Sequence, residues 1–321
     1  MKLTVDCELN SQLLGSQHLA QLLAKAKLTQ QPMPLEALVC NQYGLVSEPD
    51  YPIAAIAASA DGLDVSNAYW LRADPVHLVL QRDSFSLGEP VPLQVKPEYA
   101  QPIIASLNQH FNQDGLTFLI GDSGAWYLRV VQAPGIQTTL PTIAIAKNIY
   151  QFMPQGVASA KWLAMLNEVQ MLLHEHAANL ARESIGEVAV NSIWLSGGGM
   201  LPSAIRSQND VNLLVADSAF YQGLAKWADV PCQSVPDSLE CLLDEAGQHS
   251  HVRLQLSELQ LMDDAWWSSW WSAMLQALKN RKIQQLTLNL GFYEKTLIAE
   301  VKPLDLYKFW RSTKPLLSYL Q

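Results

Sequence analysis

The sequence predicts an α/β fold, in which a core with a parallel sheet carries a smaller inserted α+β subdomain. Strand-like and helix-like segments alternate in residues 1–67 and again from residue 149 onward, and such alternation favours parallel strands joined by helices. Residues 69–131 instead read as two strands, a helix and two further strands, which is typical of an antiparallel sheet with one helix. The predicted organisation is an α/β core domain from residues 1–67 and 136–321, and an inserted subdomain from residues 68–135.

Apolar runs and turn residues define the elements of the first segment. Asp61 and Gly62 are a turn signal that closes an apolar stretch. The expected elements are a strand at 3–8, a helix at 17–27, a strand at 37–40 and the apolar stretch at 53–60.

The inserted segment has strand patterns on both sides of one helix. Residues 121–124, Gly-Asp-Ser-Gly, predict a hairpin tip, because Asp, Ser and Gly serve turn geometry. We assign Ser123 to this turn rather than to nucleophilic catalysis. The expected elements are strands at 69–74 and 77–81, a helix at 96–112, and strands at 116–120 and 125–131.

Alternation returns in the C-terminal half of the chain. A long helix is expected through residues 168–182, followed by a buried strand at 191–195 and a turn that opens a helix near Ser203. The remaining expected elements are a strand at 211–216, helices at 218–228 and 239–245, a strand at 251–256, a Trp-rich helix at 263–280, strands at 286–290 and 297–301, and a closing helix from about residue 306.

Composition excludes several classes of partner. The 321 residues include 21 basic and 30 acidic side chains, for a net charge of −9, which disfavours duplex nucleic acid and anionic membrane surfaces as partners. No run approaches 18 uncharged apolar residues, and the N-terminus has acids within its first ten residues and no apolar h-region. We expect a soluble, cytoplasmic protein that binds neither nucleic acid nor membranes.

The sequence shows no metal-binding pattern. His174 and His176 would point about 160° apart on a helix, so they cannot bind one ion together. His249 and His251 share a face of a strand, but a lone pair there is usually polar surface. The four cysteines form no C-x-x-C pair and are expected to be buried thiols in a reducing compartment; they are Cys7, Cys40, Cys232 and Cys241.

A polar helix in residues 168–182 gives the first part of a candidate site. On one continuous helix, His176, Asn179 and Arg182 lie on one polar arc. Met165 and Leu172 interrupt that arc, so we expect it to be covered. Covered imidazole, amide and guanidinium groups need partners, which either the protein or a ligand supplies.

Three consecutive glycines, Gly197, Gly198 and Gly199, give the second part. A strand followed by glycines and a helix brings free backbone N–H groups and the positive end of a helix to one point, where an anion can bind. The spacing matches neither the dinucleotide fingerprint nor the phosphate loop. The alternative is a tight turn from strand to helix, for which glycine readily adopts positive φ.

Arg72 and Arg129 give the third part, because each lies within a largely apolar strand segment. An inward-facing arginine on a strand usually pairs with a carboxylate or with an anion of a ligand. Asp74 and Asp122 are the protein partners that the sequence offers. Alternatively, the two arginines face the glycines across a cleft and clamp a phosphate or carboxylate.

The Trp-rich helix places Trp266 with Trp270 and Trp267 with Trp271 at a spacing of four residues. Four indole side chains are too many to be buried along the narrow apolar stripe of one helix. We expect at least two to pack against the neighbouring strand and the others to form a dimer contact or to cover a pocket.

Several of these segments together resemble the RpfE-type regulatory proteins of bacteria: YWLRADPVHL with Arg72, Pro154-Gln155-Gly156, EVQMLLHEHAANLAR and VNSIWLSGGGMLP. More distantly, the chain is similar to the archaeal-type cofactor-independent phosphoglycerate mutases of the alkaline phosphatase superfamily, most densely at 138–231. In the mutases a similar His-x-x-Asn-x-x-Arg helix precedes an Asn-containing strand and a Gly-rich turn. The matching residues are His176, Asn179, Arg182, Asn191, Gly197, Gly198 and Gly199.

The resemblance implies a reduced alkaline-phosphatase-like core. It also implies what an active relative needs, namely a metal-binding Asp after the first strand, a Ser or Thr nucleophile, and a C-terminal cluster of Asp and His ligands. Asp6 and Asp61 are the candidates for the first role, but neither has the expected setting, and no nucleophile or C-terminal cluster can be assigned.

We therefore expect a non-catalytic regulatory or binding protein, a pseudoenzyme without a cofactor, whose inherited pocket binds a phosphorylated small molecule. In this hypothesis Arg72 and Arg129 clamp the anion, the glycines donate N–H groups, and the polar helix orders the wall. One alternative is an active 2,3-bisphosphoglycerate-independent mutase or phosphohydrolase that uses Mn²⁺ or Mg²⁺. The other is a protein-interaction module that forms a homodimer through the Trp-rich helix.

Overall fold

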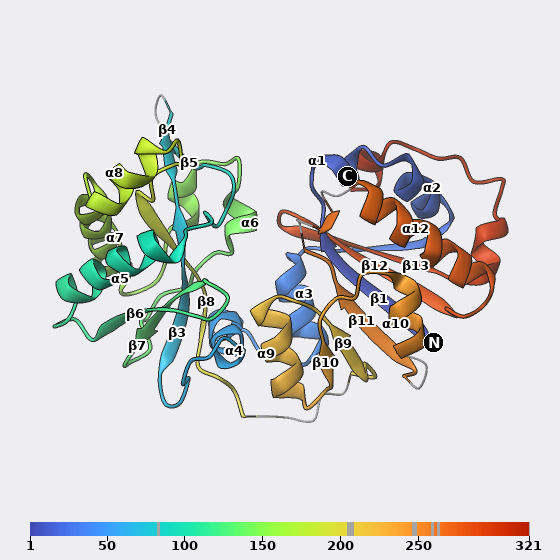
Figure 1. Ribbon diagram of the computed structural model, residues 1–321, viewed down its shortest axis with the longest axis horizontal. Coiled ribbons are helices and arrows are strands. Elements are labelled where there is room, and N and C mark those ends of the chain that lie inside the picture. The colour runs from blue at the N-terminus through green and yellow to red at the C-terminus, as the bar shows by residue number, and fades with distance from the viewer. Residues whose placement is uncertain (82–83, 204–208, 246–248, 258–259, 262–263, 321) are drawn as a thin grey trace. The chain divides into compact units, whose positions relative to one another are not determined.

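The computed structural model describes residues 1–81, 84–203, 209–245, 249–257, 260–261 and 264–320. The chain forms two compact units (Figure 1). Unit 1 combines residues 1–44 with 205–321, and unit 2 is the continuous segment 45–204.

Unit 1 is built on a seven-stranded sheet with the order β10-β9-β11-β1-β12-β13-β2. The first strand, β1, lies in the middle and pairs in parallel with both β11 and β12, whereas β13 and β2 continue the sheet in antiparallel pairs. The predicted α/β class with a parallel sheet is thereby confirmed. The strands are β1 (Lys2–Glu8), β2 (Lys27–Gln31), β9 (Leu213–Val215), β10 (Cys232–Gln233), β11 (His251–Gln255), β12 (Gln285–Phe292) and β13 (Lys295–Val301).

Helices cover both faces of this sheet. Leu3, Val5 and Cys7 of β1 face a core that includes side chains from α2, α10 and α12. Asp6 faces the opposite side, where α9 supplies Tyr221. The helices of unit 1 are α1 (Ser11–Leu14), α2 (Gln17–Lys25), α3 (Leu35–Gln42), α9 (Ala219–Ala228), α10 (Leu239–Glu245) and α12 (Asp264–Lys279).

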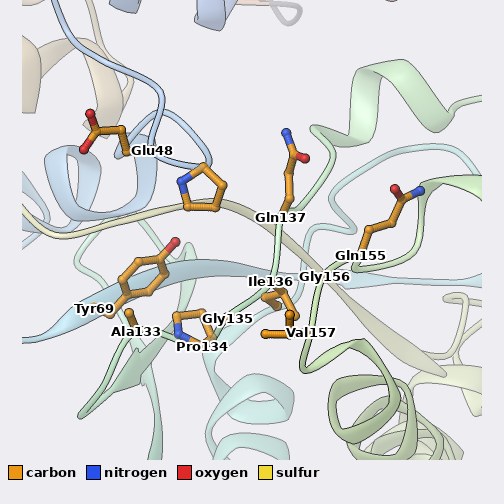
Figure 2. Close-up of a pocket in the computed structure, with 11 residues that line it drawn as sticks. Glu48, Tyr69, Ala133, Pro134, Gly135, Ile136, Gln137, Gln155, Gly156 and Val157 are labelled. Atoms are coloured by element: carbon orange, nitrogen blue, oxygen red, sulfur yellow. The ribbon is translucent and has the colours of Figure 1, made fainter.

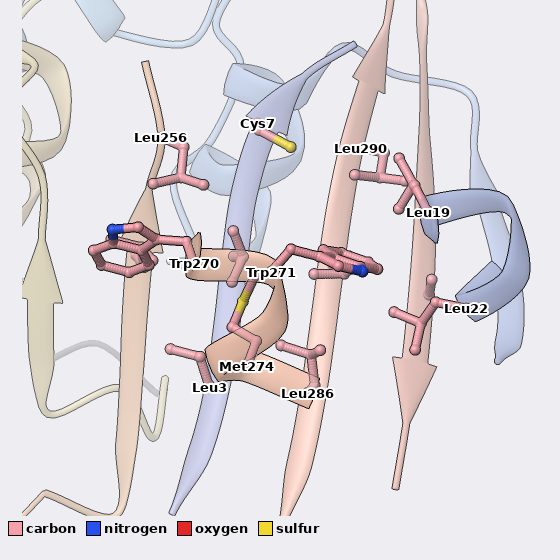
Figure 3. Packing of buried hydrophobic residues seen from close by; sticks show 14 of the residues in the cluster. Leu3, Cys7, Leu19, Leu22, Leu256, Trp270, Trp271, Met274, Leu286 and Leu290 are labelled. Atoms are coloured by element: carbon pink, nitrogen blue, oxygen red, sulfur yellow. The ribbon is translucent and has the colours of Figure 1, made fainter. Parts of the chain in front are cut away.

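The Trp-rich helix α12 packs into the core of its own unit. Trp267, Trp270 and Trp271 are 8%, 1% and 4% exposed, and Trp266 stacks on Trp270. Figure 3 shows Trp270 near Leu256, which follows β11, and shows Trp271 and Met274 near leucines of β1 and β12. The expectation that at least two of the four indoles pack in the core is therefore confirmed, and a dimer contact through this helix stays a prediction.

Unit 2 is built on an antiparallel four-stranded sheet with the order β6-β7-β3-β8. Helices α5, α7 and α8 cover one face and α4 packs on the other (Figure 1). The strands of the unit are β3 (Tyr69–Val76), β4 (Leu78–Leu80), β5 (Phe85–Leu87), β6 (Leu116–Ile120), β7 (Trp126–Val130) and β8 (Ser192–Gly199). The helices are α4 (Ile53–Ala60), α5 (Pro97–His110), α6 (Pro141–Ala144), α7 (Ser159–Leu173), α8 (Ala177–Ser184) and the 3-10 turn η1 (Ile149–Phe152).

Unit 2 extends beyond the segment 68–135 that we expected as the insertion. The strand β8, more than a hundred residues along the chain, pairs with β3. Side chains of α7 and α8 belong to the same apolar core as those of β3. These long-range contacts give a compact unit from residue 45 to residue 204.

Two expected elements of unit 1 differ from the observed ones. Residues 37–40, expected as a strand, belong to helix α3, because a short run that is buried all round has no period that separates strand from helix. The closing helix is replaced by two 3-10 turns, η2 (Pro303–Tyr307) and η3 (Leu316–Tyr319), each preceded or opened by a proline. The expected helix near Ser203 falls mainly on residues 204–208, which lie outside the described residues.

None of the helices in the described parts of the chain is long and apolar enough to span a bilayer.

Candidate functional site

Arg72 and Arg129 lie on the same face of the unit 2 sheet. Arg72 of β3 is opposite Tyr127 of β7, and Arg129 of β7 is opposite Trp70 of β3. Opposite residues of an antiparallel pair point to the same face, as do residues two apart on one strand. Arg72 and Arg129 therefore occupy diagonally related positions on one face of the sheet. Both side chains are partly exposed.

Two buried hydrogen-bond donors share this face. Ser196 of β8 is opposite Arg72 and is 0% exposed, and Trp70 is 1% exposed. Neither Ser196 Oγ nor Trp70 Nε1 has a hydrogen-bond partner among the described residues. Leaving a buried donor unpaired destabilises the folded state by about 1–3 kcal/mol. A ligand that offers hydrogen-bond acceptors to these two groups would remove that cost.

The three glycines lie within β8 and do not form the predicted turn. A Cβ atom on Gly198 would lie 2.6 Å from the Tyr69 hydroxyl, and one on Gly199 would lie 2.6 Å from Pro52 Cβ. Gly197 has φ of +63° and a Cβ position 3.0 Å from Ile53. The glycines therefore allow α4 and Tyr69 to approach β8 closely, which is why the sequence pattern of a turn was misleading.

The predicted long helix is interrupted, so its polar arc does not form. Helix α7 ends at Leu173 and α8 begins at Ala177, and Glu175 between them has φ of +56°. Such a left-handed residue ends helical geometry. His176 then starts the second helix as its N-cap.

The ring of His176 is held between two helices. Its Nδ1 accepts the Ala178 N–H at 3.2 Å, and its Nε2 lies 3.0 Å from Ser106 Oγ on α5. Because Nδ1 accepts a backbone proton, Nε2 carries the proton of the neutral ring and donates to Ser106. Burial lowers the pKa of His176, which favours that neutral form. A general base for Ser106 would need an unprotonated Nε2, so this pair stabilises structure rather than activating a nucleophile.

Asn179, Arg182 and Asn191 bind the protein's own backbone. Asn179 donates to the carbonyls of Leu173 and Val190 at 3.0 and 2.7 Å and accepts the Val190 N–H at 2.9 Å. Arg182 donates to the Val188 carbonyl and forms an ion pair of 2.8 Å with Glu187. Asn191 bonds the Leu78 N–H and carbonyl in the same way. These residues therefore connect α7, α8 and the sheet.

A second polar centre lies in unit 1, around Asp6 near the carboxyl end of β1. Asp6 is 0% exposed. Arg253 of β11 contacts both carboxylate oxygens, with Nε to Oδ2 at 2.5 Å and Nη2 to Oδ1 at 3.1 Å. Tyr221 donates to Oδ2 at 3.0 Å and Asn289 donates to Oδ1 at 2.7 Å. Four hydrogen bonds thus satisfy the carboxylate, and the guanidinium neutralises its charge.

The sequence patterns described above did not reveal this centre. Arg253 lies in the segment HVRLQL. Like Arg72 and Arg129, it is therefore an arginine within a largely apolar strand segment. That signal would have selected Arg253 as an inward-facing arginine. Its partner Asp6, however, is 247 residues away along the chain, and only the sheet order brings them together.

Neither aspartate that the resemblance offered as a metal ligand is available for an ion. Asp6 is paired with Arg253. The Asp61 carboxylate accepts the Ser123 N–H at 2.6 Å, the Ser123 hydroxyl at 2.7 Å and the Tyr127 hydroxyl at 2.9 Å. Across the described residues, no three His, Cys, Asp or Glu side chains come together in a way that could hold a metal ion. The described residues therefore do not fit a two-metal site.

Glu8 extends the unit 1 centre by one further carboxyl group. Burial, followed by the nearby Glu36 and Asp6 carboxylates, raises the pKa of Glu8 to about 8. Its carboxyl group lies over Gly291, where a Cβ atom would collide with Glu8 Oε2. Glycine at position 291 therefore makes room for a carboxyl group that is protonated at neutral pH.

We expect this carboxyl to make the free energy of unfolding depend on pH between about 4.5 and 8. The native pKa of about 8 lies above the ordinary value of 4.5, so the stabilisation is complete below pH 4.5 and is lost as pH rises through 8. The free energy of unfolding should fall by about 1 kcal/mol per pH unit in that window. Urea unfolding at several pH values measures it, and Glu8→Gln should remove this part of the slope. An equal slope in Glu8→Gln would contradict the assignment.

Comparisons with known proteins give a likeness of fold. No protein-family model and no curated protein matches the sequence. The structure is similar to the PH0037 protein from Pyrococcus horikoshii, at 11% identity, covering 94% of this chain and 87% of that chain with a TM-score of 0.51. It is also similar to the cofactor-independent phosphoglycerate mutase from Thermoplasma acidophilum, at 15% identity, covering 94% of this chain and 89% of that chain with a TM-score of 0.42. At these identities the likeness concerns the mixed α/β architecture alone.

Proposed function

We propose that this protein is a non-catalytic binding protein, and that unit 2 recognises the phosphate or carboxylate group of a small molecule. The observation that carries the proposal is the shared face of Arg72, Arg129, Ser196 and Trp70. Two of these residues are cationic, and the other two are buried donors without a partner among the described residues. We call these four residues the donor face.

An oxyanion suits the donor face better than a neutral ligand does. Guanidinium groups bind phosphate and carboxylate through charge-assisted hydrogen bonds, which are roughly twice as strong as neutral ones. An anion between the two arginines would also offer acceptors to Ser196 and Trp70.

The non-catalytic part of the proposal rests on unit 1. In an active relative, the aspartate after the first strand would hold a divalent ion, as the resemblance implies. Here Arg253 occupies both oxygens of Asp6 and provides the positive charge that a metal would supply. A regulatory role of the RpfE type accords with a binding protein whose described residues form no metal centre of this kind.

The test is a thermal melt with 3-phosphoglycerate, with Mn²⁺ in one series and EDTA in another. A ligand at about 100 times its Kd adds about 2.7 kcal/mol, which raises the Tm by several degrees at this size. We expect the same rise in both series, because no metal is required. A rise with Mn²⁺ alone, or turnover that EDTA abolishes and Mn²⁺ restores, would establish the metal-dependent mutase or phosphohydrolase instead.

Variants locate the binding on the donor face. Arg129→Ala and Arg72→Ala should each weaken 3-phosphoglycerate binding by roughly 10- to 100-fold, because each removes a hydrogen bond to a charged group. Lys161→Ala, an exposed cation on α7 of the same unit, is the matched control and should bind as the parent does. Each Tm is compared with that of the same variant without ligand. Parent-like binding by both arginine variants would contradict the proposal.

A further inference from the structure

We propose that a cavity in unit 2 is a second binding site, and that it takes a small uncharged molecule with an amide or lactam carbonyl. The cavity has a volume of about 490 Å³, within the range of ligand pockets. Its wall includes Tyr69, Pro134, Gln137, Gln155 and Val157, with Glu48 at one side (Figure 2). The inference is independent of the donor face, since none of the four donor-face residues lines this cavity.

The hydroxyl of Tyr69 supplies a donor that needs an acceptor. Tyr69 is 5% exposed, and its hydroxyl has no hydrogen-bond partner in the part of the chain that the structure describes. Two other buried tyrosines, Tyr127 and Tyr221, donate to the carboxylates of Asp61 and Asp6. Burial and the nearby Asp50 carboxylate raise the pKa of Tyr69, so the hydroxyl keeps its proton and remains a donor.

The cavity and the donor face lie on opposite sides of the sheet. Tyr69 and Arg72 are three residues apart on β3, and side chains at odd separations on a strand point to opposite faces. Tyr69 accordingly belongs to the apolar core beneath α5 and α7. A ligand in the cavity therefore does not compete with an anion at the donor face.

The wall of the cavity is held in place without a ligand. Gln137 and Gln155 exchange backbone hydrogen bonds of 2.7 and 3.0 Å, and the Gln155 side-chain amide donates to the Gln151 carbonyl at 3.1 Å. The Gln155 side-chain oxygen remains to accept from a ligand. Gly156 has φ of +124°, and a Cβ atom there would lie 2.6 Å from the Gly135 carbonyl oxygen. Only glycine allows this close backbone contact, so the pocket is largely formed in advance.

The charges of the wall exclude anions. The lining residues contain no Lys, Arg or His, and the one carboxyl group among them is that of Glu48. In Figure 2 the Glu48 carboxylate points away from the other labelled side chains. An anion would lose its hydration without gaining a cation. A carbonyl oxygen, by contrast, accepts from Tyr69, and an amide N–H or O of the ligand matches the two glutamine side chains.

The test uses three neutral carbonyl compounds as probes, namely nicotinamide, cyclo(Gly-Pro) and uridine, followed by saturation-transfer NMR. Compounds of this size should bind with Kd on the order of 1 mM. Tyr69→Phe, which removes only the hydroxyl, should weaken binding about tenfold. Val157 is 99% exposed at the wall, so Val157→Trp should block access to the cavity without disturbing the core.

Controls separate this site from the donor face. Leu180→Trp adds the same indole on α8, at a residue that is 54% exposed and does not line the cavity, so it should bind the probes as the parent does. An excess of 3-phosphoglycerate should not displace them. The proposal is overturned if no probe binds at about ten times the expected Kd, or if Tyr69→Phe and Val157→Trp both bind as well as the parent.

Discussion

Replacing Arg253 by methionine is expected to lower the free energy of unfolding by about 3–5 kcal/mol, because it leaves the buried Asp6 carboxylate without its counter-charge. Arg253 is 2% exposed and Asp6 is 0% exposed, so water cannot replace the guanidinium. Arg253 also donates to Gln42 at 2.9 Å, and that bond is lost as well. Urea unfolding at pH 7 measures the change.

The matched control and a double variant make this result specific. Arg311→Met changes an exposed arginine of the same unit and should alter stability by less than about 0.5 kcal/mol. The double variant Arg253→Met with Asp6→Leu should recover much of the loss, since replacing both members of a buried ion pair is often nearly neutral. If Arg253→Met alone were as stable as the parent, the ion pair would not be the centre of unit 1 that we describe.

Replacing Asn179 by alanine is expected to destabilise unit 2 by about 3 kcal/mol or more. The change removes three hydrogen bonds. It leaves both polar groups of the Val190 backbone unpaired in the interior, each costing about 1–3 kcal/mol, and the Leu173 carbonyl keeps only the His176 N–H. Chemical unfolding followed by a probe in unit 2 measures the loss.

The same substitution distinguishes a structural asparagine from a ligand-binding one. Glu183→Ala, at an exposed position of the same helix, is the control and should change stability little. Asn179→Ala should retain affinity for 3-phosphoglycerate at a temperature where it is folded, because its amide serves the backbone. Normal stability with lost affinity would show that the asparagine contacts the ligand, as the resemblance to the mutases implied.

Local patterns in the sequence predicted the antiparallel part of the fold well. The strands around residues 69–74, 116–120 and 125–131 and the hairpin tip with Ser123 depend on short-range alternation and turn chemistry. The structure places β3, β6 and β7 at these positions. Helix α5 was predicted for the same reason, since its apolar residues recur at helical spacing.

The remaining errors have long-range or single-residue causes. A lone left-handed residue, Glu175, divides the predicted helix, and no sequence rule marks a glutamate for that conformation. The glycines of β8 are required by contacts with Pro52 and Tyr69, which lie far away along the chain. Arg72 and Arg129 stood out in the sequence as arginines in apolar strands, but their place on one face of the sheet follows from the pairing of β3 with β7. The unpaired hydroxyl of Ser196 depends on the register of β8 against β3, and a sequence without that register cannot reveal it.

The strand order of unit 1 sets a sequence of events during protein synthesis. Strand β1 precedes unit 2 in the chain, whereas its two neighbours in the sheet, β11 and β12, are both synthesised after the whole of unit 2. The ribosome adds about 5–20 residues per second. For several seconds β1 therefore has no neighbouring strand on either side, whereas all the strands of unit 2 have already been synthesised. Lys2, Asp6 and Glu8 place charges along this waiting strand, and such charges discourage pairing with strands of other nascent chains.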